Sequence, residues 1–316
     1  PHEDSVEGRV GVRHGQRNPE SHERRVGAVS QARIPGPDAP ATSGTPARFR
    51  LIATDLDGTF LAPDQQLHPA CVSAVRQAAS RGAQVVFATG RPRRWTVVLE
   101  PLLDISYTLI ASNGAVVVDP HARRVLDFHA LGPDQALGFA ADLAELVPDV
   151  CFAVEYALDG WGADTMFAGH ETAERPDHVD TLSSLVHSGP VVKLIALSPS
   201  TPTESLARAC RQASDGRVNP TFSFARSAGF VECSAPGVSK ASALSAILDE
   251  QAVTPDEAMA FGDMPNDLEM LALVGHPYVM ANSHASVLES GYPVAGRNAE
   301  GGGGAVIARE LGLDQG

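Results

Sequence analysis

The sequence predicts an α/β protein, in which helices cover both faces of a mostly parallel sheet and a smaller α+β domain is inserted. From Phe49 onward, short apolar runs alternate with amphipathic segments of helical period, the pattern of a parallel sheet. The apolar runs are nearly continuous, as expected for strands that are buried on both faces. A less regular block over residues 133–228 separates two halves of the same style.

The first half of the predicted core alternates strands and helices in order. The run "RLIAT" (50–54) is a strand, and "HPACVSAVRQAASRG" (68–82) is a helix, with Pro69 suited to its first turn and Gly82 to its end. The run "AQVVFATG" predicts a second strand, and "RRWTVVLEPLL" predicts a helix. The segment "YTLIASNGAVVV" (107–118) reads as two strands joined by an Asn-Gly turn.

The middle block predicts the helices "DQALGFAADLAELV" and "ESLARACRQAS" and the strands "VCFAVEYA", "VVKLIALS" and "FSFARS". We then expect "GFVECS" (229–234) to restart the core. Further predicted elements are the helix "SKASALSAILDEQ", the strand "EAMAFGD", the helix "NDLEMLALV" and the last strand "PYVMANS". The predicted division is therefore a core over 48–132 and 229–316 and a cap over 133–228. Gly132 and Gly229 suit hinges between them.

Residues 1–47 are rich in Pro, Gly and Ser and show almost no apolar periodicity. Such a segment buries too little apolar area to offset its ordering entropy, so it predicts a disordered extension.

The amino-acid composition limits the binding partners that can be expected. The net charge of −14 and the pI near 5.1 repel nucleic acid and anionic membrane surfaces, so neither is expected as a partner. No apolar run approaches the roughly 18 residues of a membrane span, and no secretory signal is recognisable. The four cysteines are scattered, which suits a reducing, cytoplasmic setting. We expect a monomer or weak homodimer.

Polar residues gather where the predicted core strands end. Ligands of open parallel sheets bind beyond the carboxyl ends of the strands, so these residues are candidates for one site. They are Asp55, Asp57, Gly58, Thr59, Thr89, Gly90, Arg91, Asn113, Gly114, Asp263, Asn266 and Asp267, with Lys240 at a helix start.

The acidic members of this set predict a metal-assisted reaction at phosphorus. Clustered carboxylates repel one another, and Mg²⁺ offsets this repulsion while also binding phosphate. Asp55 is placed to attack phosphorus as a carboxylate nucleophile. Asp57, two residues on, can protonate the leaving oxygen and later activate water. Thr59, Lys240 and the backbone amides of the Gly58 turn suit phosphate binding.

At these residues the sequence resembles the haloacid dehalogenase superfamily, and the Cof-like phosphatases of subclass IIB in particular. The segments "DLDGT", "ATGR", "GVSK" and "FGDMPND" look like its four ordered motifs, and "SNGA", "MANS" and "NAEGG" match the subclass. The resemblance covers Phe49 to the end of the chain. It implies a Rossmann-like core, an inserted α/β cap and Mg²⁺-dependent hydrolysis of phosphate monoesters of small metabolites through an aspartyl-phosphate.

The resemblance also implies a role for each matching residue. Asp55 resembles the nucleophile and a metal ligand, and Asp57 the general acid and base, whose backbone carbonyl also touches Mg²⁺. Asp263 and Asp267 look like further metal ligands. Lys240 resembles the lysine that neutralises the phosphoryl group, although Ala241 follows it where a glycine is common. The implied phosphate- and substrate-binding residues are Leu56, Gly58, Thr59, Thr89, Gly90, Arg91, Asn113, Gly114, Lys240 and Asn266.

Other functions compete with this one. A phosphomutase of the same fold needs the same nucleophile. A phospho-accepting signalling domain also uses strand-end acids, a Thr and a Lys, but it lacks a long insertion. A non-catalytic phosphosugar-binding protein would not need both Asp55 and Asp57. The simplest structural alternative is that Asp57-Gly58 only forms a turn, but it leaves the other strand-end acids unexplained.

Overall fold

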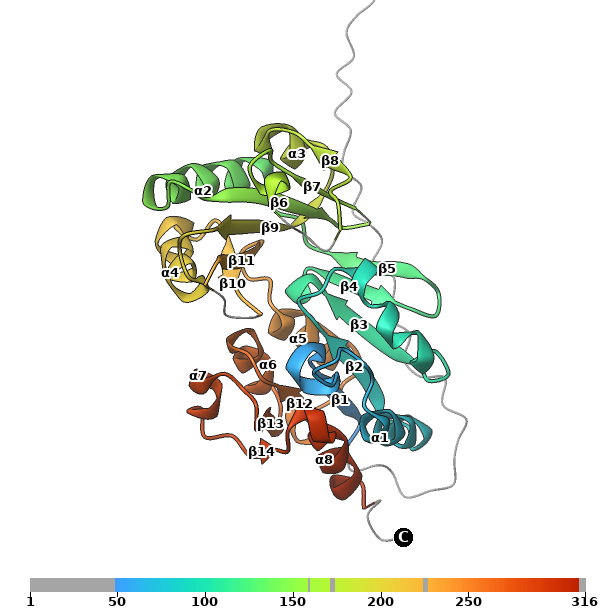
Figure 1. Cartoon of the computed structure of the whole chain (residues 1–316). Helices are drawn as coiled ribbons and strands as arrows, with labels where there is room; N and C mark the ends of the chain where they lie inside the picture. Colours follow the sequence, from blue (N-terminus) through green and yellow to red (C-terminus); the bar gives the residue numbers. More distant parts are fainter. Residues whose placement is uncertain (1–48, 159, 171–173, 224–226, 313–316) are drawn as a thin grey trace, which may run out of the picture. The chain divides into compact units, whose positions relative to one another are not determined.

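Two β-sheets organise the part of the chain that the computed structural model describes, residues 49–158, 160–170, 174–223 and 227–312. The predicted extension over residues 1–47 lies outside these ranges. The larger sheet has the strand order β14-β13-β12-β1-β2-β3-β4-β5 (Figure 1). Its strands are β1 (Leu51–Thr54), β2 (Gln84–Ala88), β3 (Tyr107–Ala111), β4 (Val116–Asp119), β5 (Arg124–Phe128), β12 (Ala258–Gly262), β13 (His276–Met280) and β14 (Val294–Ala295).

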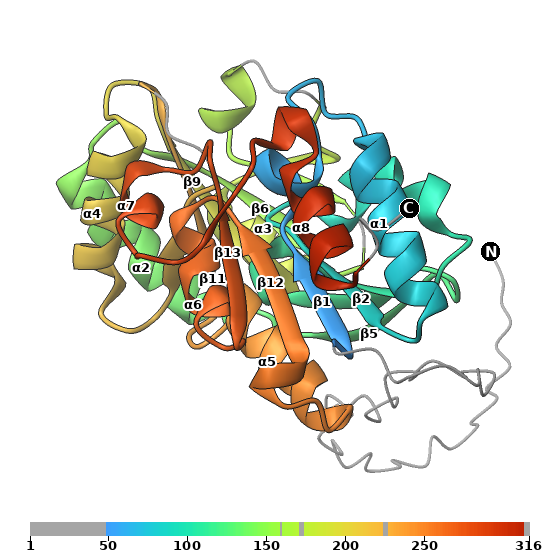
Figure 2. The same cartoon turned by 90° about the horizontal axis from the view of Figure 1, so that it is seen from below.

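The larger sheet is parallel from β14 to β3, and the hairpin partners β4 and β5 complete it in antiparallel pairing. Figure 2 shows β1 and β12 side by side, although they are far apart in the sequence. Leu51 pairs with Ala258 and with Gln84, so β1 lies at the centre. The predicted α/β class with a parallel sheet and an Asn-Gly hairpin is therefore confirmed.

Alternation along the central strands gives the sheet its two apolar faces. Ile52 packs into one cluster with residues of α1 and α8, whereas Leu51 and Ala53 pack into another with residues of α5 and α6. The main helices of this part are α1 (Pro69–Ser80), α5 (Lys240–Glu250), α6 (Leu268–Leu271), α7 (Ala285–Leu288) and α8 (Gly302–Glu310). Gly82 has a φ of +89° just after α1, as its predicted role at the helix end requires.

The smaller sheet has the order β10-β11-β9-β6-β7-β8 and is antiparallel except between β7 and β8. Its strands are β6 (Cys151–Tyr156), β7 (Trp161–Ala163), β8 (His178–Val179), β9 (Val191–Ser198), β10 (Asn219–Thr221) and β11 (Gly229–Ser234). The helices that accompany it in the chain are α2 (Pro133–Leu146), α3 (Leu182–His187) and α4 (Thr203–Ser214).

The prediction that "GFVECS" restarts the core is wrong, because this segment is β11 and pairs with β9 and β10 of the smaller sheet. Gly229 lies within β11, where a Cβ on it would lie 2.4 Å from the carbonyl oxygen of Thr201, so the strand needs glycine for this close approach. We therefore propose that the inserted segment runs beyond residue 228 and ends after Ser234. Gly237, with a φ of +74°, follows that strand.

Three other predicted elements differ from the structure. The helix expected at "RRWTVVLEPLL" is two short 3₁₀ turns, Arg93–Trp95 and Val97–Leu102, and Pro101 lies within the second. A proline removes a helical hydrogen bond, which favours such interruption. The helix predicted at 266–274 is reduced to Leu268–Leu271 after a 3₁₀ turn. Among the described residues of "FSFARS", none is in a strand; β10 precedes it at Asn219–Thr221.

Among the described residues, none of the helices has both the length and the apolar character that crossing a membrane requires.

Candidate active site

The loop after β1 is shaped by a glycine that has no room for a side chain. Gly58 has a φ of +81°, and a Cβ on it would lie 2.2 Å from Oδ2 of Asp263. Only glycine accepts both this backbone conformation and this close approach. The loop therefore places Asp55, which is 5% exposed, beside the carboxylate that follows β12. Thr59 adds a hydrogen bond of 3.0 Å from its hydroxyl to Oδ1 of Asp263.

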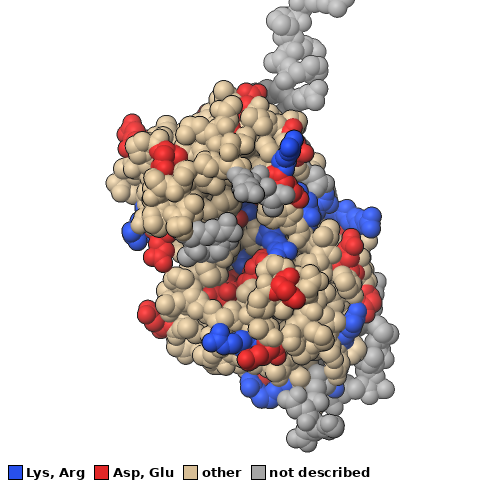
Figure 3. Space-filling model, in the orientation of Figure 1, with Lys and Arg blue, Asp and Glu red and all other residues tan. Residues whose placement is uncertain are grey.

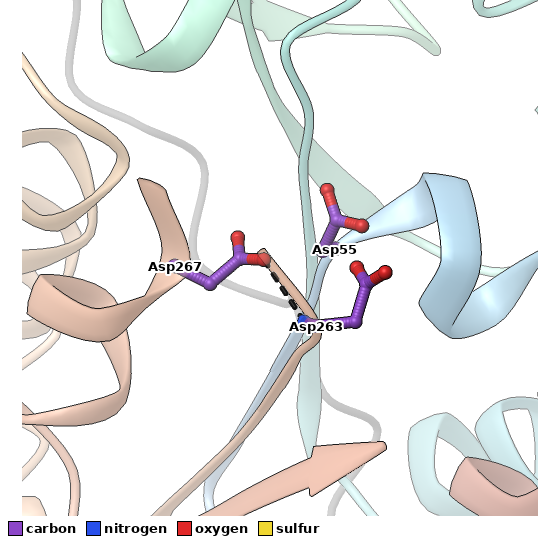
Figure 4. Close-up of side chains that lie close together, drawn as sticks. All are labelled: Asp55, Asp263 and Asp267. Carbon is purple, nitrogen blue, oxygen red and sulfur yellow. Dashed lines mark hydrogen bonds between the residues drawn. The ribbon is translucent and has the colours of Figure 1, made fainter. Parts of the chain in front are cut away.

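Three buried aspartates converge at this point. One carboxylate oxygen from each of Asp55, Asp263 and Asp267 lies within 4.8 Å of the others. Figure 4 shows Asp55 and Asp263 where their strands end and Asp267 on the short helical turn beside them. Asp267 also holds its own loop, because its Oδ2 accepts hydrogen bonds from the backbone amides of Asp263 (3.0 Å) and Met264 (2.9 Å). Asp267 therefore fixes the position of Asp263 as well as adding charge.

Lys240 is the buried cation of this cluster. Its Nζ donates to Oδ1 of Asp55 over 2.5 Å and to Oδ1 of Asp267 over 2.7 Å. The lysine begins α5, whose N-cap is Ser239. A Cβ on Gly114 would lie 2.0 Å from the carbonyl oxygen of Ser239. The glycine after β3 thus allows the start of α5 to approach the strand ends and brings Lys240 into the site.

The charges of the cluster shift one another's ionisation. Burial raises the pKa of Asp55 well above its usual range, and the ammonium of Lys240 only partly opposes this shift. Burial, together with the neighbouring Asp267, raises the pKa of Asp263 to about 7. Burial would lower the pKa of Lys240, but the carboxylates of Asp267 and Asp55 outweigh it and raise that pKa. Three carboxylates thus lie around one ammonium, so the cluster carries more negative than positive charge.

The donor set of the cluster fits a hard divalent cation. Mg²⁺ prefers oxygen ligands, of which carboxylates are the strongest in proteins. The excess of negative charge and the raised pKa of Asp263 are the features that such an ion would relieve. Asp55, Asp263 and Asp267 could each supply an oxygen. Asp57 is not in this group of three, because its carboxylate faces elsewhere.

Asp57 forms a two-bond ion pair with Arg91. The guanidinium donates from Nε to Oδ2 over 2.7 Å and from Nη2 to Oδ1 over 2.6 Å. The hydrogen bond to Asp57 raises the pKa of Arg91. Arg91 follows Thr89 and Gly90 after β2, and its backbone amide donates to the hydroxyl of Thr89 over 3.1 Å. The loops after β1 and β2 are thus tied together by side chains that the sequence nominated for one site.

Asn113 joins the loop after β3 to two other parts of the chain. It has a left-handed backbone with a φ of 55°. Its Oδ1 accepts from Nδ2 of Asn266 over 2.9 Å, and its own Nδ2 donates to Glu232 over 3.0 Å. The buried Oδ1 of Asn266 has no hydrogen-bond partner among the described residues. The side chain of Leu56 is fully buried, so only its backbone can face a ligand.

Sequence reasoning missed two asparagines that hold the loop after β1. Nδ2 of Asn282 donates to the carbonyl of Gly58 over 2.7 Å, and its Oδ1 accepts from the amide of Asn298 over 2.9 Å. Nδ2 of Asn298 in turn donates to the carbonyl of Leu61 over 2.9 Å. Both lie in segments, "MANS" and "NAEGG", that carried the resemblance without an assigned role. An Asn two or three residues after a strand end was the available signal.

Sequence reasoning also missed three charged residues within apolar strands of the smaller sheet, Glu155, Lys193 and Glu232. They are buried and contact the loops after β2 and β3, Glu155 through the hydroxyl of Ser112. In the hollow at the middle of the face drawn in Figure 3, Lys and Arg occur together with Asp and Glu. A charged residue inside an otherwise apolar run was the signal for them.

Comparison with known proteins places these features in a family. The model for haloacid dehalogenase-like hydrolases matches residues 52–307. An HMP-PP phosphatase of Serratia proteamaculans is 29% identical over 255 residues, which cover 74% of this chain and 85% of that protein.

Solved structures show the same fold. SMU.1108c from Streptococcus mutans UA159 has a TM-score of 0.72 and 24% identity, and the match covers 84% of this chain and 99% of that one. The structure described as the HAD subclass IIB sugar phosphatase BT4131 has a TM-score of 0.68 and 18% identity over the same shares of the two chains. The resemblance expected from the sequence motifs is confirmed.

Proposed function

This chain belongs to the haloacid dehalogenase-like hydrolase family and is a hydrolase of the phosphatase class; from that premise we propose that it hydrolyses phosphate monoesters of small metabolites, with Mg²⁺, through a phosphorylated Asp55. The observation that carries the proposal is the buried group of Asp55, Asp263 and Asp267 around the ammonium of Lys240. A nucleophile, a cation for the phosphoryl oxygens and metal ligands are the parts that this reaction requires.

In the proposed first step, a carboxylate oxygen of Asp55 attacks phosphorus and the bond from phosphorus to the leaving oxygen breaks. Lys240 holds Oδ1 of Asp55 over 2.5 Å, which orients the carboxylate. The leaving oxygen takes a proton from Asp57, so that an alcohol departs. Asp57 can do this only as the carboxylic acid, so it must first release the guanidinium of Arg91 and take up a proton.

In the second step, Asp57 takes a proton from water, and the water oxygen attacks the phosphorus of the aspartyl-phosphate. The bond between phosphorus and the Asp55 oxygen breaks, which releases inorganic phosphate, restores the carboxylate of Asp55 and leaves Asp57 as the carboxylic acid that the next turnover requires. Lys240 and the hydroxyl of Thr59 are the polar groups beside this position. Mg²⁺ held by Asp55, Asp263 and Asp267 would neutralise charge on the phosphoryl oxygens when it is bound.

Small organic phosphates are the substrate class that the similar proteins support. The curated relative is called an HMP-PP phosphatase, and one structural neighbour is described as a sugar phosphatase. The four cysteines of this chain are all free and buried, which supports the proposed cytoplasmic setting. The test is the release of p-nitrophenol and of inorganic phosphate from p-nitrophenyl phosphate, with Mg²⁺ and with excess chelator. Nitrophenol without phosphate in solution would instead favour transfer to another acceptor, as in a phosphomutase.

A further inference from the structure

Three charged side chains lie next to one another on neighbouring strands of the smaller sheet. Glu155 on β6, Lys193 on β9 and Glu232 on β11 are 3%, 2% and 7% exposed. Nζ of Lys193 lies 2.5 Å from Oε1 of Glu232 and 3.3 Å from Oε2 of Glu155. Glu155 pairs with Lys193 in the strand register. We call these residues the Glu-Lys-Glu cluster.

The Glu-Lys-Glu cluster contacts the loops that carry the proposed phosphate site. Lys193 donates to the carbonyl oxygen of Gly90 over 2.5 Å, directly after Thr89. Glu232 accepts from Asn113 over 3.0 Å, and Asn113 is also bonded to Asn266. A Cβ on Gly90 would lie 3.2 Å from Oε2 of Glu232. The cluster is therefore adjacent to the phosphate site, on the side of the inserted segment.

A purely structural contact between two parts of the chain does not require this cluster, because burying charged groups costs desolvation free energy. The cluster buries two carboxylates with one ammonium, and apolar residues of similar volume often serve such a purpose equally well or better. Arg94 lies 3.6 Å from Oε1 of Glu155. It also lines a cavity of about 470 Å³ together with Tyr156, Gly160, Trp161, Asp177 and His178. Free space thus borders the cluster on the side of Glu155.

We propose that Glu155, Lys193 and Glu232 recognise the leaving group of the substrate and select one that presents hydroxyl or amino groups and carries no negative charge. The inference rests on the proposed phosphatase function. Two carboxylates accept hydrogen bonds from such donors, and Lys193 donates to an oxygen of the same group. With Arg94 and its second partner Glu174 included, a leaving group that carries a carboxylate meets three carboxylates and two cations, so it is disfavoured.

The contacts to the core loops show how a leaving group could enter. The hydrogen bonds of Lys193 to Gly90 and of Asn113 to Glu232 join strands of the smaller sheet to the loops after β2 and β3 of the larger sheet. When these hydrogen bonds break, Lys193 and Glu232 lose hydrogen-bond partners, which costs free energy until a bound molecule supplies new partners. A leaving group rich in hydroxyl or amino groups supplies those partners. A leaving group without hydroxyl or amino groups leaves these charged side chains without partners, and this difference in binding free energy is the source of selectivity.

The experiment compares kcat and KM for several phosphate monoesters in the full-length protein with Mg²⁺. Hexose phosphates, pentose phosphates and pyridoxamine phosphate present donors, phosphoglycerate presents a carboxylate, and p-nitrophenyl phosphate presents neither. The variants are Glu232→Gln, Glu155→Gln and Lys193→Met. Asp149→Asn is the matched control, because Asp149 also accepts side-chain and backbone hydrogen bonds in the inserted segment, from Ser198 and Ser200.

The wild-type protein should prefer at least one donor-bearing ester to phosphoglycerate by about 10-fold or more. Each cluster variant should lose about 10- to 100-fold in kcat/KM for that ester, mainly through KM. Turnover of p-nitrophenyl phosphate and competitive inhibition by inorganic phosphate should change less than about threefold. The control should leave all of these quantities unchanged.

Two results would overturn the inference. One is a wild-type preference for phosphoglycerate. The other is a set of variants that lose donor-bearing esters and p-nitrophenyl phosphate to the same extent, since the cluster would then be a joint that positions the core loops. Three separate substitutions, with inhibition by inorganic phosphate as a check of the folded site, guard against a single variant that fails to fold. If the wild-type protein hydrolysed no phosphate ester at all, the proposed function would fail, a result distinct from an active protein with unselective variants.

Discussion

Lys240 Nζ lies 2.5 Å from Oδ1 of Asp55, although the two residues are 185 positions apart in the sequence. Both are buried, and the same ammonium lies 2.7 Å from Oδ1 of Asp267. This one lysine therefore neutralises the proposed nucleophile and holds the loop that carries Asp263. Removing or adding one charge at this point should change stability and activity together.

Substitution of Lys240 by methionine should leave Asp55 and Asp267 without their buried cation. Breaking a buried ion pair on one side typically costs about 3–5 kcal/mol, so the variant should lose that much of its free energy of unfolding in metal-free buffer. Activity should fall as well. Arg76→Met is the control, because Arg76 and Asp104 form an exposed ion pair, and such pairs contribute about 1 kcal/mol or less. Urea unfolding measures both variants, and equal small losses would contradict the role given to Lys240.

Mg²⁺ should stabilise the folded protein as well as permit turnover. An ion that binds only the folded state at about 100 times its dissociation constant adds about 2.7 kcal/mol. Thermal unfolding with excess Mg²⁺ and with excess chelator should therefore give a higher Tm in Mg²⁺. Asp263→Asn should reduce this difference, since it removes one ligand from the cluster. A Tm that does not respond to Mg²⁺ in the wild-type protein would contradict the metal site.

The metal-free protein should lose stability as the pH rises through the range set by Asp263. The pKa of Asp263 is raised from 3.8 to about 7 by burial and by Asp267. Between these values the folded state binds more protons than the unfolded state, so stability falls with rising pH. Asp263 then contributes fully below about pH 4, and its contribution is lost as the pH approaches 7.

This dependence is tested as a difference between two proteins, since other groups titrate in the same range. In chelator, Asp263→Asn should gain stability relative to wild type when the pH is raised from about 5 to about 8. Added Mg²⁺ should reverse that gain, because the ion pairs with the ionised carboxylate. A Tm difference that stays constant over this range would show that Asp263 does not titrate as proposed.

Gly58→Ala should damage the site more than the fold. The alanine would be strained at a φ of +81°, and its Cβ would displace the carboxylate of Asp263, which lies 2.2 Å away. Gly216→Ala is a matched control, because Gly216 has a φ of +73° and open space around it. Both should lose about 1–2 kcal/mol from backbone strain, but only Gly58→Ala should lose Mg²⁺-dependent turnover by 10-fold or more. Equal activities in the two variants would show that the approach of Gly58 to Asp263 is unimportant.

The strand-end residues were predictable because their grouping follows from topology. In a parallel sheet the carboxyl ends of adjacent strands lie at one edge, so Asp55 after β1 and Asp263 after β12 meet without any knowledge of side chains. Gly58 and Gly114 were nominated as turn residues, but the reason they must be glycine, a contact with Asp263 and with Ser239, depends on packing between distant segments.

Pairing between distant segments also explains what the sequence did not predict. The strand "GFVECS" resembles a core strand in composition, and only its register with β9 and β10 assigns it to the smaller sheet. The ion pair of Arg91 with Asp57 depends on two loops that the sheet brings together. Lys193 reads as an interruption of an apolar run until its contact with Gly90 is known.

Phosphorylation of Asp55 is tested by acid quenching of the enzyme during turnover of p-nitrophenyl phosphate, followed by mass spectrometry of its peptides. Asp57→Asn should raise the amount of phosphoenzyme, because p-nitrophenolate leaves without a proton whereas the attacking water needs a base. We expect one phosphoryl group on the peptide that contains Asp55, in wild type and in Asp57→Asn, and none in Asp55→Asn. A phosphoryl group on another residue, or wild-type turnover by Asp55→Asn, would contradict this expectation.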